Sequence, residues 1–352
     1  MAFDASQPSM PERDVGARAE AAFAAEIIPQ IRALHDRRTA LREQTRREVL
    51  IAGLAALGAA FLLAFVPIEG SVWMLAFIAG AVFIGWRLTA LQKAWQSHVI
   101  ETVMPVLCDA LPDMTYKNDY IDSAIVNIFE DAGVIGKSNS QKLSHLISGR
   151  HRAIGFELLY ADLYNRSSGR GGRGGSSSNV FHGLLFRIEV PITVPIQVLI
   201  KPRPYGIPAS FGRLFEPSVI AQLAEVDLAP GEFTTKFEVR AALRDTDDAD
   251  HVRTLISPGL QRAFLDLNER EGALLGNRAA FSAAFADNSF HLALARWTKT
   301  SIAGIGFERP RPFLDPGLYL LGDEAELGRR LRSVLDDVQI AYRLIDRLHA
   351  TD

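Results

Sequence analysis

The chain has 352 residues, of which 48% are hydrophobic and 22% charged, and its formal net charge at pH 7 is −3. One globular core usually serves about 100 to 200 residues, so more than one structural unit is expected, and the slightly acidic balance disfavours a nucleic-acid-binding protein. Cys108 is the only cysteine, which excludes a disulfide framework within one chain, fits a reducing compartment and suggests a small buried side chain.

Residues 1–47 are predicted to be cytoplasmic and to contain an amphipathic helix, because apolar side chains recur there at steps of three, four and seven. These side chains are Phe23, Ile27, Ile31, Leu34 and Leu41. The segment is too long and polar for a secretory signal, so we expect no cleavage.

Residues 48–91 are predicted to form a transmembrane helical hairpin, with apolar runs over about 49–67 and 72–90. As a helix, the first run approaches the roughly 30 Å of a hydrocarbon core. Arg87, near the end of the second run, can extend to the membrane interface. The alternative is a buried hairpin within a soluble protein, but both runs lack the polar face that soluble helices keep.

Basic residues flank the hairpin at its two outer ends, whereas the connection carries only Glu69. The positive-inside rule therefore predicts that both termini and the large domain are cytoplasmic. The basic residues are Arg32, Arg37, Arg38, Arg42, Arg46, Arg47, Arg87 and Lys93. No ionisable residue occurs over Val49–Phe65 or Val72–Trp86, so transport by this hairpin alone is not expected.

Residues 92–150 are predicted to form a helical stalk and linker, because the apolar period of the second run continues into them. Its positions are Leu88, Leu91, Trp95, Val99, Val103 and Val106. Pro105 is expected to kink or end this helix. A second stripe, between Ile121 and Ala132, predicts a further helix that stops at Gly133.

Residues 151–322 are predicted to form a strand-rich α+β cytoplasmic domain with a mostly antiparallel sheet, since aromatic and β-branched residues become frequent. The predicted strands are Phe156–Leu163, Val180–Val190, Ile196–Lys201, Phe233–Leu243, Ala279–Phe285 and Phe290–Ala295. The last two form a hairpin, and Ser257-Pro258 begins a helix. The glycine-rich segment 167–178 is expected to be a flexible loop.

Residues 323–352 are predicted to form a long C-terminal amphipathic helix, with apolar residues alternating at steps of four and three, as in a coiled coil. They are Leu327, Leu331, Val334, Val338, Ala341, Ile345 and Leu348. This stripe favours packing on the sheet or the stalk, and its alternative role is self-association into a homo-oligomer.

Two short motifs resemble ligand sites but lack the necessary context. The pattern G-x-G-x-x-G begins at Gly169, yet a strand follows it, whereas a dinucleotide site needs a helix there. The acidic run from Asp245 to Asp250 fails as a calcium loop, because Asp250 occupies the glycine position and Ile256 the final acid position. We interpret this run as a turn and helix cap.

No catalytic, cofactor-binding or metal-binding residue is assigned, and no cofactor is expected. The eight histidines show no H-E-x-x-H spacing. Glu157 and Asp162 lie on a predicted strand near His151, and a polar pocket lined by His151, Glu157 or His182 would favour an enzyme.

Several short segments resemble the bacterial family catalogued as domain of unknown function 3137. They are Gly155-Phe156-Glu157-Leu158-Leu159, Val180-Phe181-His182-Gly183-Leu184-Leu185, Phe233-Thr234-Thr235-Lys236-Phe237-Glu238-Val239 and Leu255-Ile256-Ser257-Pro258. The resemblance runs from the stalk to the C-terminus, but the strand at Phe156–Asp162 and the glycine-rich loop depart from the family's glutamate-rich strand and charged loop. It implies a bacterial inner-membrane protein and supplies no activity or catalytic residues.

The leading functional hypothesis is a non-enzymatic, membrane-anchored cytoplasmic interaction or regulatory domain in the bacterial inner membrane. Its partners would be the lipid bilayer, an unidentified protein and, through the C-terminal helix, a second copy of the chain, with no nucleic acid. The alternatives are an enzyme or binding protein acting on a lipid or membrane-associated substrate, and an accessory subunit of a membrane complex.

Overall fold

The chain forms two compact units, one comprising Met1–Leu111 with Leu314–Val334 and the other Pro112–Phe313 with Leu335–Asp352. The computed structural model describes residues 21, 23–64, 72–109, 111, 113–118, 121–167, 176–190, 194–203, 223–274, 281–302, 305–310 and 324–349. The tip of the glycine-rich loop, residues 168–175, lies outside the described residues.

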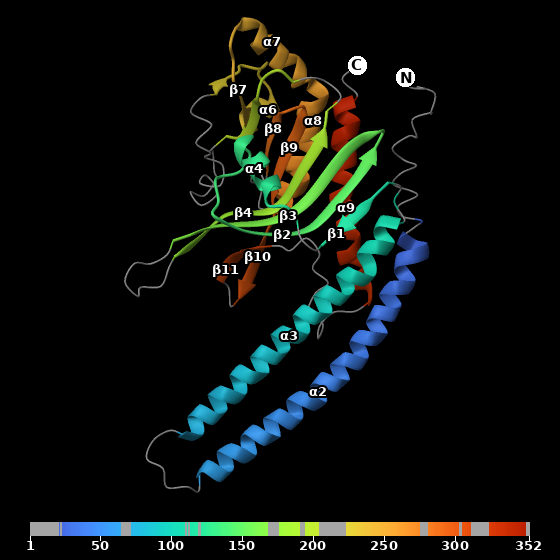
Figure 1. Cartoon of the computed structure of the whole chain (residues 1–352), viewed down its shortest axis with the longest axis vertical. Coiled ribbons are helices and arrows are strands. Elements are labelled where there is room, and N and C mark those ends of the chain that lie inside the picture. Colours follow the sequence, from blue (N-terminus) through green and yellow to red (C-terminus); the bar gives the residue numbers. More distant parts are fainter. Residues whose placement is uncertain are drawn as a thin grey trace. The chain divides into compact units, whose positions relative to one another are not determined.

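The first unit contains two long helices that lie side by side and antiparallel (Figure 1). A short π-helix, η1 (Phe23–Ile27), precedes α2 (Ile28–Ala64), and α3 spans Val72–Asp109. Six of the predicted apolar positions are buried, namely Ile27, Ile31, Leu34, Trp95, Val99 and Val103, whereas Leu41, Leu88, Leu91 and Val106 are half-buried. Two paired helices are thus present where the stalk is predicted, and α3 continues through Pro105 instead of ending there.

In the described ranges of both units, no helix combines the length and the hydropathy that a membrane crossing requires.

The second unit is built on a nine-stranded sheet, counted over the described residues, in the order β1-β2-β3-β4-β9-β8-β5-β7-β6. Every pairing in it is antiparallel. Its strands are β1 (Thr115–Lys117), β2 (Ser140–His151), β3 (Ile154–Arg166), β4 (Ser177–Glu189), β5 (Val198–Pro202), β6 (Ala224–Glu225), β7 (Phe237–Ala241), β8 (Phe281–Ala286) and β9 (Ser289–Ala295). The predicted α+β class with an antiparallel sheet is confirmed.

A separate two-stranded ribbon consists of β10 (Trp297–Ile302) and β11 (Ile305–Pro310). It follows β9 directly in the chain, and one residue, Arg296, separates the two. The Arg296 N–H donates to the His182 carbonyl at 2.9 Å, so the chain leaves the main sheet beside β4.

The sheet extends further toward the N-terminus than predicted, because β1 and β2 lie in residues 92–150, the expected helical stalk and linker. The sequence of β2, from Ser140 to His151, is largely polar and so does not predict a strand. Its strand conformation depends on pairing with β3. Of the predicted strand Phe233–Leu243 only β7 is a strand. The short helix α6 (Glu232–Lys236) precedes it, and Thr234 Oγ1 accepts from the Gly231 N–H at 3.0 Å.

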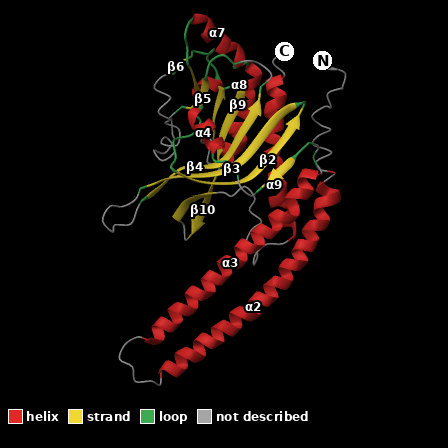
Figure 2. Cartoon of the chain, viewed as in Figure 1, coloured by secondary structure: helices red, strands yellow, loops and turns green. Residues whose placement is uncertain are grey.

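Helices cover both faces of the sheet (Figure 2). On one face, α4 (Ala124–Asp131) places Phe129 with its ring centre 5.3 Å from that of His291. Neighbouring strand residues point to opposite faces, so Phe290 faces α8 (Pro258–Leu274), where Phe264 lies 6.0 Å away. The same face receives Tyr342 of α9 (Glu324–His349).

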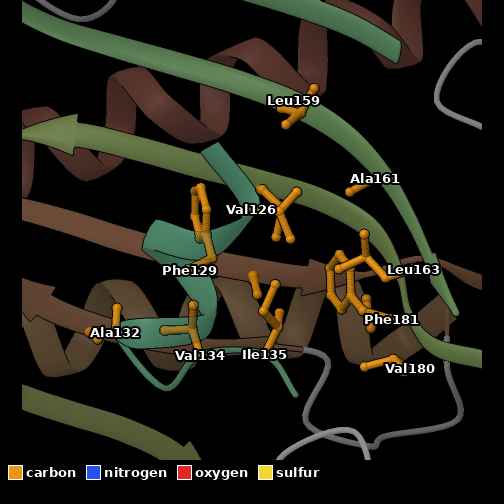
Figure 3. Packing of buried hydrophobic residues seen from close by; sticks show 14 of the residues in the cluster. Val126, Phe129, Ala132, Val134, Ile135, Leu159, Ala161, Leu163, Val180 and Phe181 are labelled. Carbon is orange, nitrogen blue, oxygen red and sulfur yellow. The ribbon is translucent and has the colours of Figure 1, made fainter. Parts of the chain in front are cut away.

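The core under α4 is formed by side chains from that helix, from the segment after it and from the central strands (Figure 3). Val126 and Phe129 are 1% exposed, and Leu163 and Phe181 are fully buried. This packing holds β3 and β4 in a rigid layer, which determines where the side chains on their opposite face lie.

Local signals in the second unit give the structures that the sequence predicts. Asp245 Oδ1 accepts from the Asp248 N–H at 3.0 Å and caps α7 (Thr246–Leu255), and Ser257 caps α8. The hairpin β8–β9 turns at Asp287 and Asn288, which have φ values of 50° and 57°. Two consecutive positive φ values are typical of the type I′ turn of tight hairpins.

The predicted C-terminal helix is confirmed as α9. Five residues of its apolar stripe are buried within the single chain, namely Leu331, Val334, Val338, Ala341 and Ile345. Self-association through this stripe would therefore require these side chains to be uncovered first.

Candidate functional site

Two β-bulges interrupt the regular pairing on either side of β3. In β2, Ser144 pairs with Tyr160 and Ile147 with Leu158, so β2 carries one extra residue between them. His145 lies in this bulge with a φ of 58°, which is uncommon for a residue other than glycine. In β4, Val180 is the extra residue opposite Leu163 and Tyr164. Such bulges redirect side chains and are frequent next to functional sites.

A hydrogen-bonded line of side chains lies between these bulges. Tyr160, Asp162 and Tyr164 alternate along β3 and so share one face of the sheet. His182 of β4 lies in register opposite Asp162, and its Nδ1 is 2.9 Å from Asp162 Oδ1. The other ring nitrogen, Nε2, is 2.8 Å from the Tyr160 hydroxyl. The line is driest at His182, which is 3% exposed, whereas Asp162 is 17% exposed.

The Asp162 carboxylate has further hydrogen bonds. The Tyr164 hydroxyl donates to Oδ2 at 2.5 Å, and Asn179 Nδ2 lies 3.4 Å from Oδ1. Burial by itself would raise the pKa of Asp162, but the hydrogen bonds from His182 and Tyr164 outweigh it and lower that pKa. Burial and the same carboxylate raise the pKa of Tyr164 to about 12. Asp162 is therefore a carboxylate and Tyr164 a neutral phenol at neutral pH.

The ionised Asp162 determines how the His182 ring is oriented. A carboxylate only accepts hydrogen bonds, so the ring proton is assigned to Nδ1 from the network. In that tautomer Nε2 is an acceptor, and the Tyr160 hydroxyl donates to it. The order hydroxyl, imidazole, carboxylate is that of a nucleophile, a base and an orienting acid.

The Tyr160 phenol nevertheless differs from an activated nucleophile. Burial raises its pKa, and the charge of Asp162 raises it further. An activated nucleophile needs the opposite shift or a base that removes its proton easily. The arrangement is suited to holding a proton in a defined position and to fixing β3 against β4.

A second histidine, His145, and a third tyrosine, Tyr116, extend the line toward the edge of the sheet. The Tyr116 hydroxyl lies 2.8 Å from His145 Nδ1, and the His145 ring is edge-on to Tyr160 with centres 6.2 Å apart. Burial, and secondarily the charge of Lys142, lower the pKa of His145 to about 4. At neutral pH this imidazole is therefore uncharged.

The residues singled out from the sequence separate into three places. Asp162 and His182 come together as described. Glu157 is on the opposite face of β3, where Arg187 Nη1 lies 3.5 Å away. His151 lies at the β2–β3 turn, with its Nε2 2.8 Å from Asp346 Oδ1 and its ring stacked on Tyr342.

The two tyrosines that β3 contributes to the site, Tyr160 and Tyr164, were not predicted. The available signal was the alternation Tyr160-Ala161-Asp162-Leu163-Tyr164 on a predicted strand, which places three polar side chains on one face. The partner strand was predicted as well, but the register that sets His182 opposite Asp162 depends on the bulge at Val180. Across the described ranges, no group of three or more His, Cys, Asp or Glu side chains could hold a metal ion.

Comparisons with protein-family models, with curated proteins and with solved structures found no match to this chain. The resemblance to domain of unknown function 3137 stays a prediction.

Proposed function

We propose that this protein is a bacterial inner-membrane protein whose helices α2 and α3 insert into the bilayer as a hairpin, and whose sheet-bearing unit is a non-enzymatic cytoplasmic interaction domain. The observation that supports the anchor most directly is a belt of exposed apolar side chains on these helices. We call it the apolar belt. It consists of Leu50, Ile51, Leu54, Leu57, Ile78, Val82, Phe83 and Trp86, which are 51% to 67% exposed.

The two halves of the apolar belt lie at the same height along the helix pair. Arg87 Nη2 donates to Glu48 Oε2 at 3.2 Å, which sets the register of the antiparallel helices next to the belt. From this pair, Leu50–Leu57 and Ile78–Trp86 run in the same direction along the two helices. In sequence the apolar character continues to Pro67, and a helix over Val49–Pro67 would measure about 28 Å.

Exposure of this belt to water is unfavourable. Transfer of a whole leucine, valine or phenylalanine side chain out of water stabilises by roughly 1.5 to 3 kcal/mol, so half-exposed ones contribute about 1 kcal/mol each. The eight residues of the belt thus contribute on the order of 8 kcal/mol to insertion. Patches of this kind mark contact with a membrane or a partner.

The polar site around Tyr160 and His182 supports binding rather than catalysis in the cytoplasmic unit. Tyr160 has a raised pKa, and the imidazole beside it is almost fully buried. The site thus lacks an activated, accessible nucleophile.

Vesicle flotation of the full-length protein tests the anchor. The unmodified chain is expected to float with vesicles and to stay bound after an alkaline wash, because the belt is buried in hydrocarbon. The double variant Leu54→Glu, Val82→Glu should lose most of this binding. Ala33→Glu introduces the same acid on an exposed position of α2 outside the belt and should float like the unmodified protein. Full-length protein that stays monodisperse in water and does not float would overturn the anchor.

Purification in mild detergent tests the interaction role. A stoichiometric copurifying protein or a defined homo-oligomer, detected by mass spectrometry and light scattering, is the expected result. A monomer that retains a discrete metabolite would contradict this role.

A second candidate function is an enzyme acting on a lipid or a membrane-associated substrate, which the line Tyr160–His182–Asp162 favours. Proteoliposomes containing ester lipids would be incubated and analysed for hydrolysis products. Turnover that His182→Gln and Tyr160→Phe both abolish would establish it, and turnover equal to that of empty vesicles would reject it.

A further inference from the structure

We propose that the helix pair carries a basic collar that binds anionic phospholipid headgroups immediately below the apolar belt. This inference rests on the proposed membrane anchor and names the lipid class that surrounds it. The collar is defined as residues 42–48 of α2 and 87–93 of α3, which the Glu48–Arg87 ion pair holds at the same level.

The collar has an excess of positive charge. Its cations are Arg42, Arg46, Arg47, Arg87 and Lys93 and its anions are Glu43 and Glu48, so five positive and two negative charges leave +3. The connection over 65–71, at the other end of the pair, contains one acid, Glu69, and no base. An anionic lipid surface is therefore attracted to one end of the hairpin only.

The cations of the collar differ in how far they are available to a ligand. Arg87 is committed to Glu48 at 3.2 Å. Arg42, Arg46 and Arg47 are exposed and form no ion pair with any residue in the described ranges. Arginine binds phosphate through two parallel N–H donors, which matches a phosphodiester headgroup.

The height of the collar fits the headgroup layer. Arg42 is eight residues below Leu50, the first residue of the belt in α2, which corresponds to about 12 Å along the helix. Arg46 and Arg47 are closer, at about 6 Å and 5 Å. The polar layer on each side of a hydrocarbon core is about 5 to 8 Å thick, and long basic side chains extend along it.

Trp86 provides a native probe at this position. It is 64% exposed and directly precedes Arg87. Full-length protein would be reconstituted into vesicles that contain either brominated phosphatidylglycerol or brominated phosphatidylcholine at equal mole fraction. Bromine quenches tryptophan fluorescence on contact, and Trp86→Phe identifies the part of the signal that belongs to this residue.

The expected result is stronger quenching of Trp86 by the brominated anionic lipid, with a preference that weakens between about 0.05 and 0.5 M salt. Arg46→Gln should reduce the preference about fivefold, and Arg42→Gln, Arg46→Gln and Arg47→Gln together should abolish it. Arg37→Gln is the matched control. Arg37 is also exposed on α2, but it lies nine residues before Arg46. The separation along the helix is about 14 Å, which exceeds the roughly 8 Å screening length at physiological salt.

The contrary outcomes separate the two proposals. Equal quenching by the two brominated lipids, unaffected by the arginine variants, would overturn the collar and leave the anchor intact. Quenching of Trp86 by neither lipid would overturn the anchor, and the collar with it.

Discussion

Asp162 and His182 face each other across the β3–β4 pairing, with 2.9 Å between Asp162 Oδ1 and His182 Nδ1. The pair is almost completely removed from water on its histidine side, and Asp162 has a second strong donor in Tyr164. A partly buried carboxylate with these partners stabilises the fold only while it is ionised.

Asp162→Asn is expected to lower the free energy of unfolding at pH 7 by about 2 kcal/mol, because charge-assisted hydrogen bonds become neutral. The lowered pKa of Asp162 means that this stabilisation is present above the unfolded value near 4 and is lost as pH falls further. Urea unfolding at pH 7 and pH 3 measures both. Asp131→Asn is the control, because that carboxylate is 71% exposed in its ion pair with Lys137, and it should change stability by less than about 0.5 kcal/mol.

His291 should make the protein less stable in acid. It is 1% exposed, and neither ring nitrogen has a hydrogen-bond partner in the described ranges. Burial lowers the pKa of His291 to about 4. The backbone of Ala286 acts in the opposite direction and raises this pKa, but it is not placed to form a regular hydrogen bond with the ring. The unfolded histidine, with a pKa near 6.5, takes up its proton first, so stability is complete above about pH 6.5 and decreases toward pH 4.

The corresponding substitution is His291→Leu, which removes two unpaired polar atoms from the core. Stability at pH 7 should rise by about 1 kcal/mol, and the decrease between pH 6.5 and 4 should become smaller by on the order of 3 kcal/mol. His251→Leu, at an exposed site on α7, should leave the pH profile unchanged. An identical pH profile in His291→Leu and the unmodified protein would contradict the prediction.

Arg296 is expected to be essential for packing α8 and α9 on the sheet. Its guanidinium forms an ion pair with Glu271 of α8 at 2.7 Å and another with Asp337 of α9, and all three side chains are buried. Arg296→Met should cost about 3 to 5 kcal/mol, because it removes one buried cation that forms ion pairs with two buried carboxylates. Arg270 contacts the same Glu271 from an exposed position, at 3.4 Å, so Arg270→Met should cost less than about 1 kcal/mol. Equal losses in thermal unfolding would refute this assignment.

Gly183 permits the close approach of β4 and β9. Its φ is +157°, and a Cβ atom there would lie 2.1 Å from the backbone oxygen of Leu294. Gly183→Ala should therefore destabilise by about 3 kcal/mol or more, since the obstacle is backbone and cannot rotate away. Gly259→Ala, in α8, meets no atom closer than 3.8 Å and should be neutral or slightly stabilising. Denaturant unfolding of both variants measures the two changes in stability. A similar loss in both would show that any added methyl group destabilises the protein and would contradict a specific close contact at Gly183.

Cys108 should be chemically inert in the folded protein. It is 4% exposed in α3, and burial, with a smaller contribution from Asp109, raises the pKa of its thiol to about 11. Because the thiolate is the reactive form, maleimide should label Cys108 at pH 7 only after unfolding. Ser97→Cys, at an exposed position of the same helix, should be labelled at once. Rapid labelling of the native unmodified chain would show that the α2–α3 pair opens at that end.

Elements with strong local signals could be predicted from the sequence. The long helices, the caps at Asp245 and Ser257 and the hairpin β8–β9 depend on residues near one another in the chain. By contrast, β2 could not be predicted, because its strand character comes from pairing with β3 rather than from its own polar residues. The helical start of Phe233–Leu243 was missed although its cause is local, a hydrogen bond between the Gly231 N–H and Thr234 Oγ1.

The sequence by itself determined the separation of a helix pair from a strand-rich unit, the antiparallel class of the sheet and the absence of a local catalytic motif. It did so because periodicity, turn residues and composition act over a few residues. Tertiary structure alone decided that the late hairpin β8–β9 lies between β4 and β5. It also decided that Asp162 joins His182 whereas Glu157, five residues earlier, faces the other side. The physical reason is that register and bulges, which require two strands to meet, determine which side chains share a face of the sheet.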